Sequence, residues 1–163
     1  MSYQTWHEYG FGLNFSLFEA ECEKVGDPIT VENVERLLAC NLPLQRDVHE
    51  WLDEIKEGNP DYVVTLDDYR DFDQDFRLGL SKLFADVIQG TEELPHVYAT
   101  CDYNNDHYVI FGQGYPWNMT EKEKGITVDE METIFRAYLA ILKPATSGQL
   151  YVDIDNQSIE NGG

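Results

Sequence analysis

Apolar residues recur every three or four positions across residues 66–89, the longest such run in the chain. Positions i, i+3, i+4 and i+7 share one face of a helix, so this spacing predicts a single long amphipathic helix. Thr65 and Asp68 resemble a capping box at its start, and Gly90 provides a C-terminal stop. The chain must build a core around the apolar stripe of this helix: Tyr69, Phe72, Phe76, Leu80, Leu83, Phe84 and Val87.

Other patterns predict strands on both sides of this helix. Alternation over residues 3–13 indicates a first strand, and two β-like runs around the turn-rich Asn104-Asn105-Asp106 indicate a hairpin, 97–103 and 107–111. Residues 149–154 are typical of a final strand. Caps and periodicity predict four further helices: 17–25, 30–41, 43–57 and one that begins after the Thr127 capping box.

The order of these elements predicts an α+β fold. We expect an antiparallel sheet of about four strands with several helices packed on one face, in the order β-α-α-α-α-β-β-α-β. The length of 163 residues fits one domain. We place this single domain at residues 1–160, with a helical segment at about 17–89 and a frayed tail at 161–163.

The charge balance restricts the class of partner. There are 31 acidic residues against 11 Lys and Arg, and the formal net charge is −20. Disorder is not expected, because 42% of the residues are hydrophobic and 13% are aromatic, enough to build a core. A surface of this charge repels nucleic-acid phosphates and anionic lipid head groups. We therefore expect no direct nucleic-acid binding and no membrane binding, and a basic protein as the natural partner.

Cysteine usage and hydropathy indicate a location. Cys22, Cys40 and Cys101 are odd in number and far apart, so they fit neither a disulfide framework nor a paired metal site. The chain opens without a basic segment followed by an apolar one, and nowhere do about 18 apolar residues run together. We expect a protein of the reducing cytoplasm.

Ten of the 31 acidic residues fall within residues 50–75, against two basic ones. Four of these acids form a row that spans about 12 Å of the predicted long helix, at about 1.5 Å per residue. One DNA strand places roughly 3.5 phosphates in that length. That row is Asp67, Asp68, Asp71 and Asp75. The preceding helix adds acids opposite its apolar stripe: Glu50, Asp53, Glu54 and Glu57. The alternative is a solvated helix face, because charge blocks most often only keep a protein soluble.

Tyr115 and Trp117 flank Pro116 in the loop that follows the predicted hairpin. Exposed aromatic side chains anchor interfaces efficiently, so this loop is a candidate contact surface. The favoured interpretation is that it closes the edge of the core, because large aromatic side chains are usually at least partly buried.

Motifs for catalysis or metal binding are incomplete. Residues 102–106 imitate the start of an EF-hand loop, but His107 and Gln113 stand where the loop needs glycine and glutamate. The four histidines lack zinc-ligand spacing. Cys101, Asp102 and His107 are an alternative nucleophilic group, without a nucleophile motif around them. We predict no enzymatic activity, no catalytic residues, no metal site and no cofactor.

Three segments resemble small proteins encoded by phages and integrative elements of Firmicutes: Tyr3-Gln4-Thr5-Trp6-His7-Glu8-Tyr9-Gly10, Tyr115-Pro116-Trp117-Asn118-Met119-Thr120-Glu121, and Ser158-Ile159-Glu160-Asn161-Gly162-Gly163. The size and charge are similar to those of anti-CRISPR and anti-restriction proteins, several of which imitate nucleic acid. This resemblance implies an inhibitor of a host nuclease that acts in the bacterial cytoplasm.

The resulting hypothesis is a non-enzymatic inhibitor whose acidic helical face occupies the DNA-binding groove of a nuclease, preferably an RNA-guided type II effector. In a variant of this hypothesis, Tyr115 and Trp117 make the contact and the inhibition is allosteric. The alternative function is an acidic accessory or regulatory protein-binding domain of a phage or mobile element, with no nuclease target.

Overall fold

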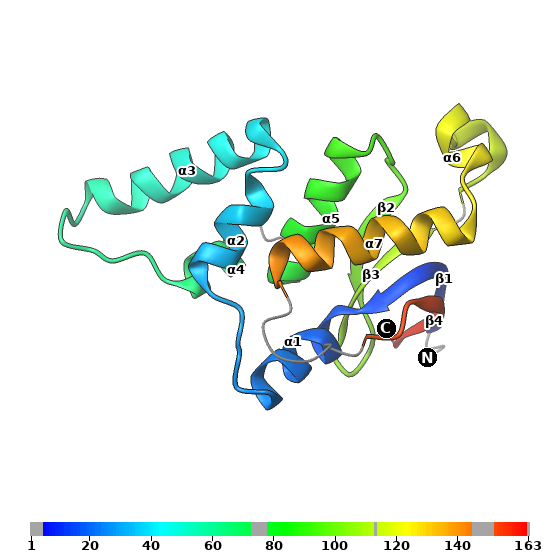
Figure 1. Cartoon of the computed structure of the whole chain (residues 1–163), viewed down its shortest axis with the longest axis horizontal. Helices are drawn as coiled ribbons and strands as arrows, with labels where there is room; N and C mark the ends of the chain where they lie inside the picture. Colours follow the sequence, from blue (N-terminus) through cyan, green and yellow to red (C-terminus); the bar gives the residue numbers. More distant parts are fainter. Residues whose placement is uncertain (1–4, 73–77, 113, 145–151, 163) are drawn as a thin grey trace, which may run out of the picture.

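The computed structural model describes residues 5–72, 78–112, 114–144 and 152–162 (Figure 1). It contains an antiparallel four-stranded sheet with the strand order β2-β3-β1-β4. The strands are β1 (Thr5–Asn14), β2 (Val97–Cys101), β3 (His107–Gly112) and β4 (Asp155–Gly162). The helices are α1 (Phe15–Lys24), α2 (Val31–Leu38), α3 (Leu42–Glu57), α4 (Leu66–Asp71), α5 (Leu80–Thr91), α6 (Glu121–Gly125) and α7 (Val128–Leu142), with a 3-10 turn η1 (Pro116–Asn118). The predicted α+β class is confirmed.

The main core lies between one face of the sheet and the helices. Odd-numbered positions of the strands, such as Leu13, Val97 and Val109, are fully buried on this face, as the alternation of a strand requires. Phe84 of α5 and Phe135 of α7 pack into the same cluster. The helical periodicity therefore predicted the core-facing side chains of α5 correctly: Leu80, Leu83, Phe84 and Val87.

The sheet is strongly curled. A Cβ on Gly12 would overlap the carbonyl oxygen of Val109, so β1 approaches β3 more closely than a side chain permits. In the turn between β2 and β3, the Tyr103 backbone N–H donates to the carbonyl of Glu160 at 3.0 Å and joins this end of the hairpin to the edge strand β4. The face opposite the main core thus forms a concave interior, where Ile110 is buried.

The final strand begins later than the sequence predicts. Of the expected strand 149–154, residues 149–151 lie outside the described residues, and 152–154 precede β4. β4 instead pairs with β1 from Asp155 opposite Gly12 to Gly162 opposite Thr5. Asn161 and Gly162 therefore lie in a strand instead of the expected frayed tail.

The expected single helix over residues 66–89 is wrong. α4 ends at Asp71, and Phe72 has an extended backbone with φ −63° and ψ 125°. Gly79 has φ 62°, a conformation that glycine adopts without strain, and α5 begins directly after it. The two helices bury their apolar sides in different places, because Phe72 packs edge-on against Trp51 of α3 at 5.6 Å whereas α5 packs against the sheet.

Candidate protein-interaction surface

Helix α3 extends away from the sheet and forms the far left of the molecule in Figure 1. Its start is set locally, because the side chain of Asn41 accepts a hydrogen bond from the N–H of Leu44 at 3.2 Å and Pro43 occupies the first turn. Val48 and Leu52 bury its inner side against the rest of the protein. The outer side is left to solvent along the whole helix.

The outer side of α3 carries five exposed carboxylates, which we call the α3 acidic face: Asp47, Glu50, Asp53, Glu54 and Glu57. At about 100° per residue they occupy an arc of roughly 120° opposite the buried side, over a length of about 15 Å. None of the five forms an ion pair with a residue in the described ranges. Arg46 lies on the same arc at its N-terminal end.

The predicted acidic row on the next helix is shorter than expected. Asp67 and Asp71 are exposed one turn apart on α4, but the helix ends there and Asp75 lies outside the described residues. Asp67 is also 3.8 Å from the Arg70 side chain, which makes a closer ion pair with Glu19 of α1 at 3.0 Å. Among the described residues, α4 therefore adds two acids to the surface, Asp67 and Asp71.

Asp68, the remaining acid of the predicted row, has a structural role. Its carboxylate accepts hydrogen bonds from the Tyr62 hydroxyl at 2.7 Å and from the Thr65 backbone N–H at 2.8 Å. Burial opposes ionisation, but these hydrogen bonds outweigh it and lower the pKa of Asp68. Asp68 therefore caps α4 and holds the preceding loop.

A polar cluster that the sequence did not predict joins α3 to α2 and α4. Glu35 accepts a hydrogen bond from the Tyr69 hydroxyl at 2.6 Å and contacts the His49 ring nitrogen at 2.8 Å. Burial raises the pKa of Glu35, and its bonds to Tyr69 and His49 lower it further than burial raises it. This cluster holds the projecting helix at its base, so the orientation of the α3 acidic face depends on Glu35.

Tyr115 and Trp117 are exposed, at 65% and 76% of their surfaces. Their rings stack on each other at 4.8 Å with an interplanar angle of 3°. The interpretation that they close the edge of the core is wrong. They form a second exposed feature, at η1 beside α6, at the end of the molecule opposite α3 (Figure 1).

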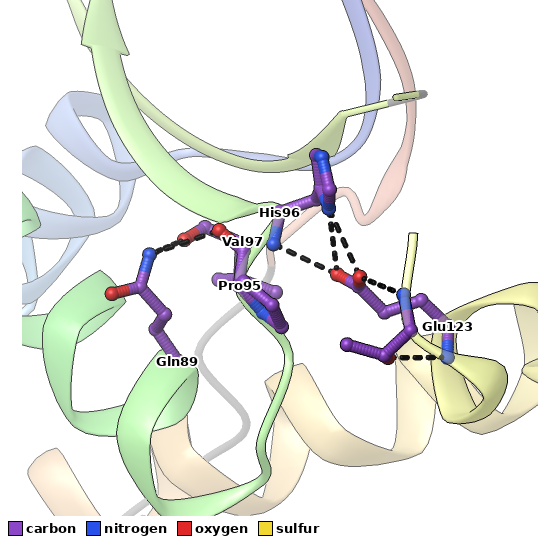
Figure 2. Close-up of polar contacts among 6 residues, drawn as sticks. Gln89, Pro95, His96, Val97 and Glu123 are labelled. Carbon is purple, nitrogen blue, oxygen red and sulfur yellow. Dashed lines mark hydrogen bonds and ion pairs between the residues drawn. The ribbon is translucent and has the colours of Figure 1, made fainter. Parts of the chain in front are cut away.

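A buried carboxylate joins α6 to the segment that precedes β2 (Figure 2). Glu123 of α6 is buried and accepts hydrogen bonds from the His96 backbone N–H at 2.8 Å and from the N–H of Thr120 at 3.1 Å, and it lies 2.9 Å from the His96 ring Nδ1. Burial disfavours the charged form, yet these bonds lower the pKa of Glu123. Gln89 adds bonds to the carbonyls of Pro95 and Val97 on the same segment.

The alternative nucleophilic group lacks the lowered thiol pKa that is typical of a reactive cysteine. Burial raises the pKa of the Cys101 thiol, with Asp102 and Glu8 adding to the effect, whereas a nucleophilic cysteine needs a lowered pKa. Asp102 accepts from the N–H groups of Asn104 and Asp106 at 2.9 Å and thereby shapes the hairpin turn. Burial also lowers the pKa of His107, which pairs with Cys101 across the strands.

Within the described residues, no group of three or more His, Cys, Asp or Glu side chains is placed to hold a metal ion. Nor is any helix of the described part of the chain long and apolar enough to cross a membrane. Comparisons with protein-family models, with curated proteins and with solved structures found no match.

Proposed function

We propose that the protein is a non-enzymatic inhibitor that places the α3 acidic face in the nucleic-acid groove of a host nuclease, with an RNA-guided type II effector as the preferred target. The observation that supports this proposal is the row of five exposed carboxylates on a helix that projects from the body, none of which has an ion-pair partner among the described residues. Nucleic-acid grooves in such effectors are lined with positive charge. A projecting acidic helix can enter such a groove without rearrangement of the sheet.

The spacing of the charges supports the same proposal. Five carboxylates lie along about 15 Å of helix, and one DNA strand carries about four phosphates over that length. Like charges at i,i+4 positions, such as Glu50 and Glu54, repel each other by a few tenths of a kcal/mol. A basic partner relieves that repulsion, and the net charge of −20 speeds the encounter with it.

A charge-reversal experiment with a matched control tests the proposal. The triple variant E50K/E54K/E57K changes three positions of the α3 acidic face, and E23K/D129K/E160K changes three exposed acids on α1, α7 and β4 by the same total charge. Inhibition of DNA cleavage by a guide-loaded type II effector is measured for both. We expect the α3 triple to lose inhibition about ten-fold or more and the control triple to stay near wild type.

Equal loss in both triples would mean that total charge matters and not α3, which contradicts the proposal. Inhibition that is unchanged in both triple variants also contradicts the proposal. So does the absence of inhibition by the wild-type protein across type II effectors, and this result favours the accessory or regulatory domain instead.

The exposed Tyr115 and Trp117 pair supports the variant in which the aromatic surface binds the effector. Y115A/W117A separates the two modes, because stacked and exposed rings contribute little to the fold and much to an interface. Loss of inhibition in Y115A/W117A with retention in E50K/E54K/E57K assigns the contact to the aromatic pair.

A further inference from the structure

The concave interior of the curled sheet contains a carboxylate in an unusual setting. Glu8 of β1 is half-buried and lies on the face opposite the main core. The Thr100 hydroxyl donates to its Oε2 at 2.5 Å and the Tyr98 hydroxyl donates to its Oε1 at 3.3 Å. The two hydroxyls hold the carboxylate plane in one orientation.

No cationic side chain neutralises this carboxylate within the described parts of the chain. A carboxylate has about four lone-pair positions, and the two hydroxyls use one on each oxygen. Removing a charge from water without a partner is costly. The Glu8 carboxylate is half-buried and each of its oxygens accepts one hydrogen bond, so a cation is its favoured additional neighbour. Burial, and then the charge of Glu8, raise the pKa of Tyr98 to about 12, so Tyr98 remains a donor.

A surface cavity of about 470 Å³ adjoins Glu8. This volume lies within the range of ordinary small-ligand sites, which are common at the mouths of β-barrels. Gly112 shapes its wall, since a Cβ there would lie 2.7 Å from the Tyr98 ring and displace it. The cavity is lined by His7, Glu8, Tyr9, His96, Tyr98 and Gly112.

We propose that this cavity binds a guanidinium group, with the Glu8 carboxylate as its anion. The planar fork of a guanidinium matches the two remaining lone pairs, one on each carboxylate oxygen, which a single ammonium point charge does not. The phenol ring of Tyr98 in the same wall adds an aromatic neighbour for the cation. The net charge of −20 of the whole protein disfavours anionic ligands and attracts cations.

The test compares two ligands of the same shape on the wild-type protein. Acetyl-arginine amide carries the guanidinium, and acetyl-citrulline amide replaces it by a neutral urea group. Binding is followed by the amide resonances of Tyr98 and Gly112 in a titration. We expect saturable shifts with the arginine compound and none with the citrulline compound. A short glycine–arginine peptide is titrated in the same way. If the natural ligand is an arginine side chain of a partner protein, the peptide binds more tightly than a free guanidinium cation.

Two variants locate the site. Glu8→Gln removes the charge and we expect at least about ten-fold weaker binding. Glu160→Gln, on the exposed surface of the adjacent strand β4, removes the same charge and we expect less than about a two-fold change. Equal binding of arginine and citrulline compounds, no binding of either, or equal weakening in both variants overturns the proposal. The ligand comparison needs no variant, so it decides the matter even if Glu8→Gln fails to fold.

Discussion

Carboxylates on α3 and carboxylates that face the body of the protein have opposite surroundings. Each acid of the α3 acidic face is exposed and lacks an ion pair in the described structure, whereas Glu35, Asp68 and Glu123 each accept several hydrogen bonds. The same residue types therefore serve two purposes in one chain. In a strongly acidic protein, the role of a carboxylate therefore depends on the hydrogen-bond donors around it, and not on its position in a charged segment of the sequence.

Glu123→Ala should give the largest loss of stability. It leaves the His96 N–H and the Thr120 N–H without their acceptor in a buried place, which costs about 3 kcal/mol. Urea denaturation followed by circular dichroism measures the free energy of unfolding. A loss below about 1 kcal/mol would contradict the assignment of Glu123 as a buried anchor.

Glu35→Ala should have the next largest effect, about 1–2 kcal/mol, because the Tyr69 hydroxyl loses its acceptor at the base of α3. Tyr69→Phe removes the donor instead and is the matched control. If the effects of the two variants are additive in a double-mutant cycle, the Glu35–Tyr69 hydrogen bond between α2 and α4 does not contribute to stability.

The free energy of unfolding should decrease as the pH is lowered, because these same acids become protonated. The pKa values of Glu35, Asp68 and Glu123 are lowered by their hydrogen bonds in the folded protein. Their contribution is therefore complete above the unfolded pKa of about 4, and is lost as the pH falls through the lower folded values. We expect a shallower pH dependence between about pH 5 and 2 in Glu123→Gln than in the wild-type protein, measured by thermal unfolding.

Substitutions on the α3 acidic face should have the smallest effect on stability. Glu50→Ala and Glu54→Ala remove exposed side chains that have no described ion-pair partner, and we expect changes within about 0.5 kcal/mol. A loss comparable to that of Glu35→Ala would show that these acids support the fold, and the contrast between the two groups of carboxylates would disappear.

Local patterns predicted the elements that local interactions build. The α3 boundaries, the cap at Thr127 and the hairpin agree with the structure to within a few residues, because each rests on contacts between near neighbours in the chain. The acidic face of α3 was found for the same reason. The predicted helix over residues 66–89 runs through Gly79, whereas the positive φ of this glycine separates α4 from α5.

Contacts between distant residues were not predictable from the same patterns. Glu35 meets Tyr69 across 34 positions, and Glu123 meets the His96 backbone across 27. The strand β4 has the polar sequence DNQSIENG without alternation of apolar residues, and it is a strand because β1 supplies the hydrogen-bonding ladder. The exposure of Tyr115 and Trp117 also depends on the tertiary structure, which directs η1 away from the core.

The pairing of β1 with β4 has a consequence for how the chain folds during synthesis. Thr5 is paired with Gly162, so β1, which is made before the other three strands of the sheet, receives one of its two neighbours only when residues 155–162 have left the ribosome. Until then the β1 edge facing β4 is unpaired, and closing so long a loop is slow. A nascent chain stalled before residue 155 should therefore present this edge to chaperones.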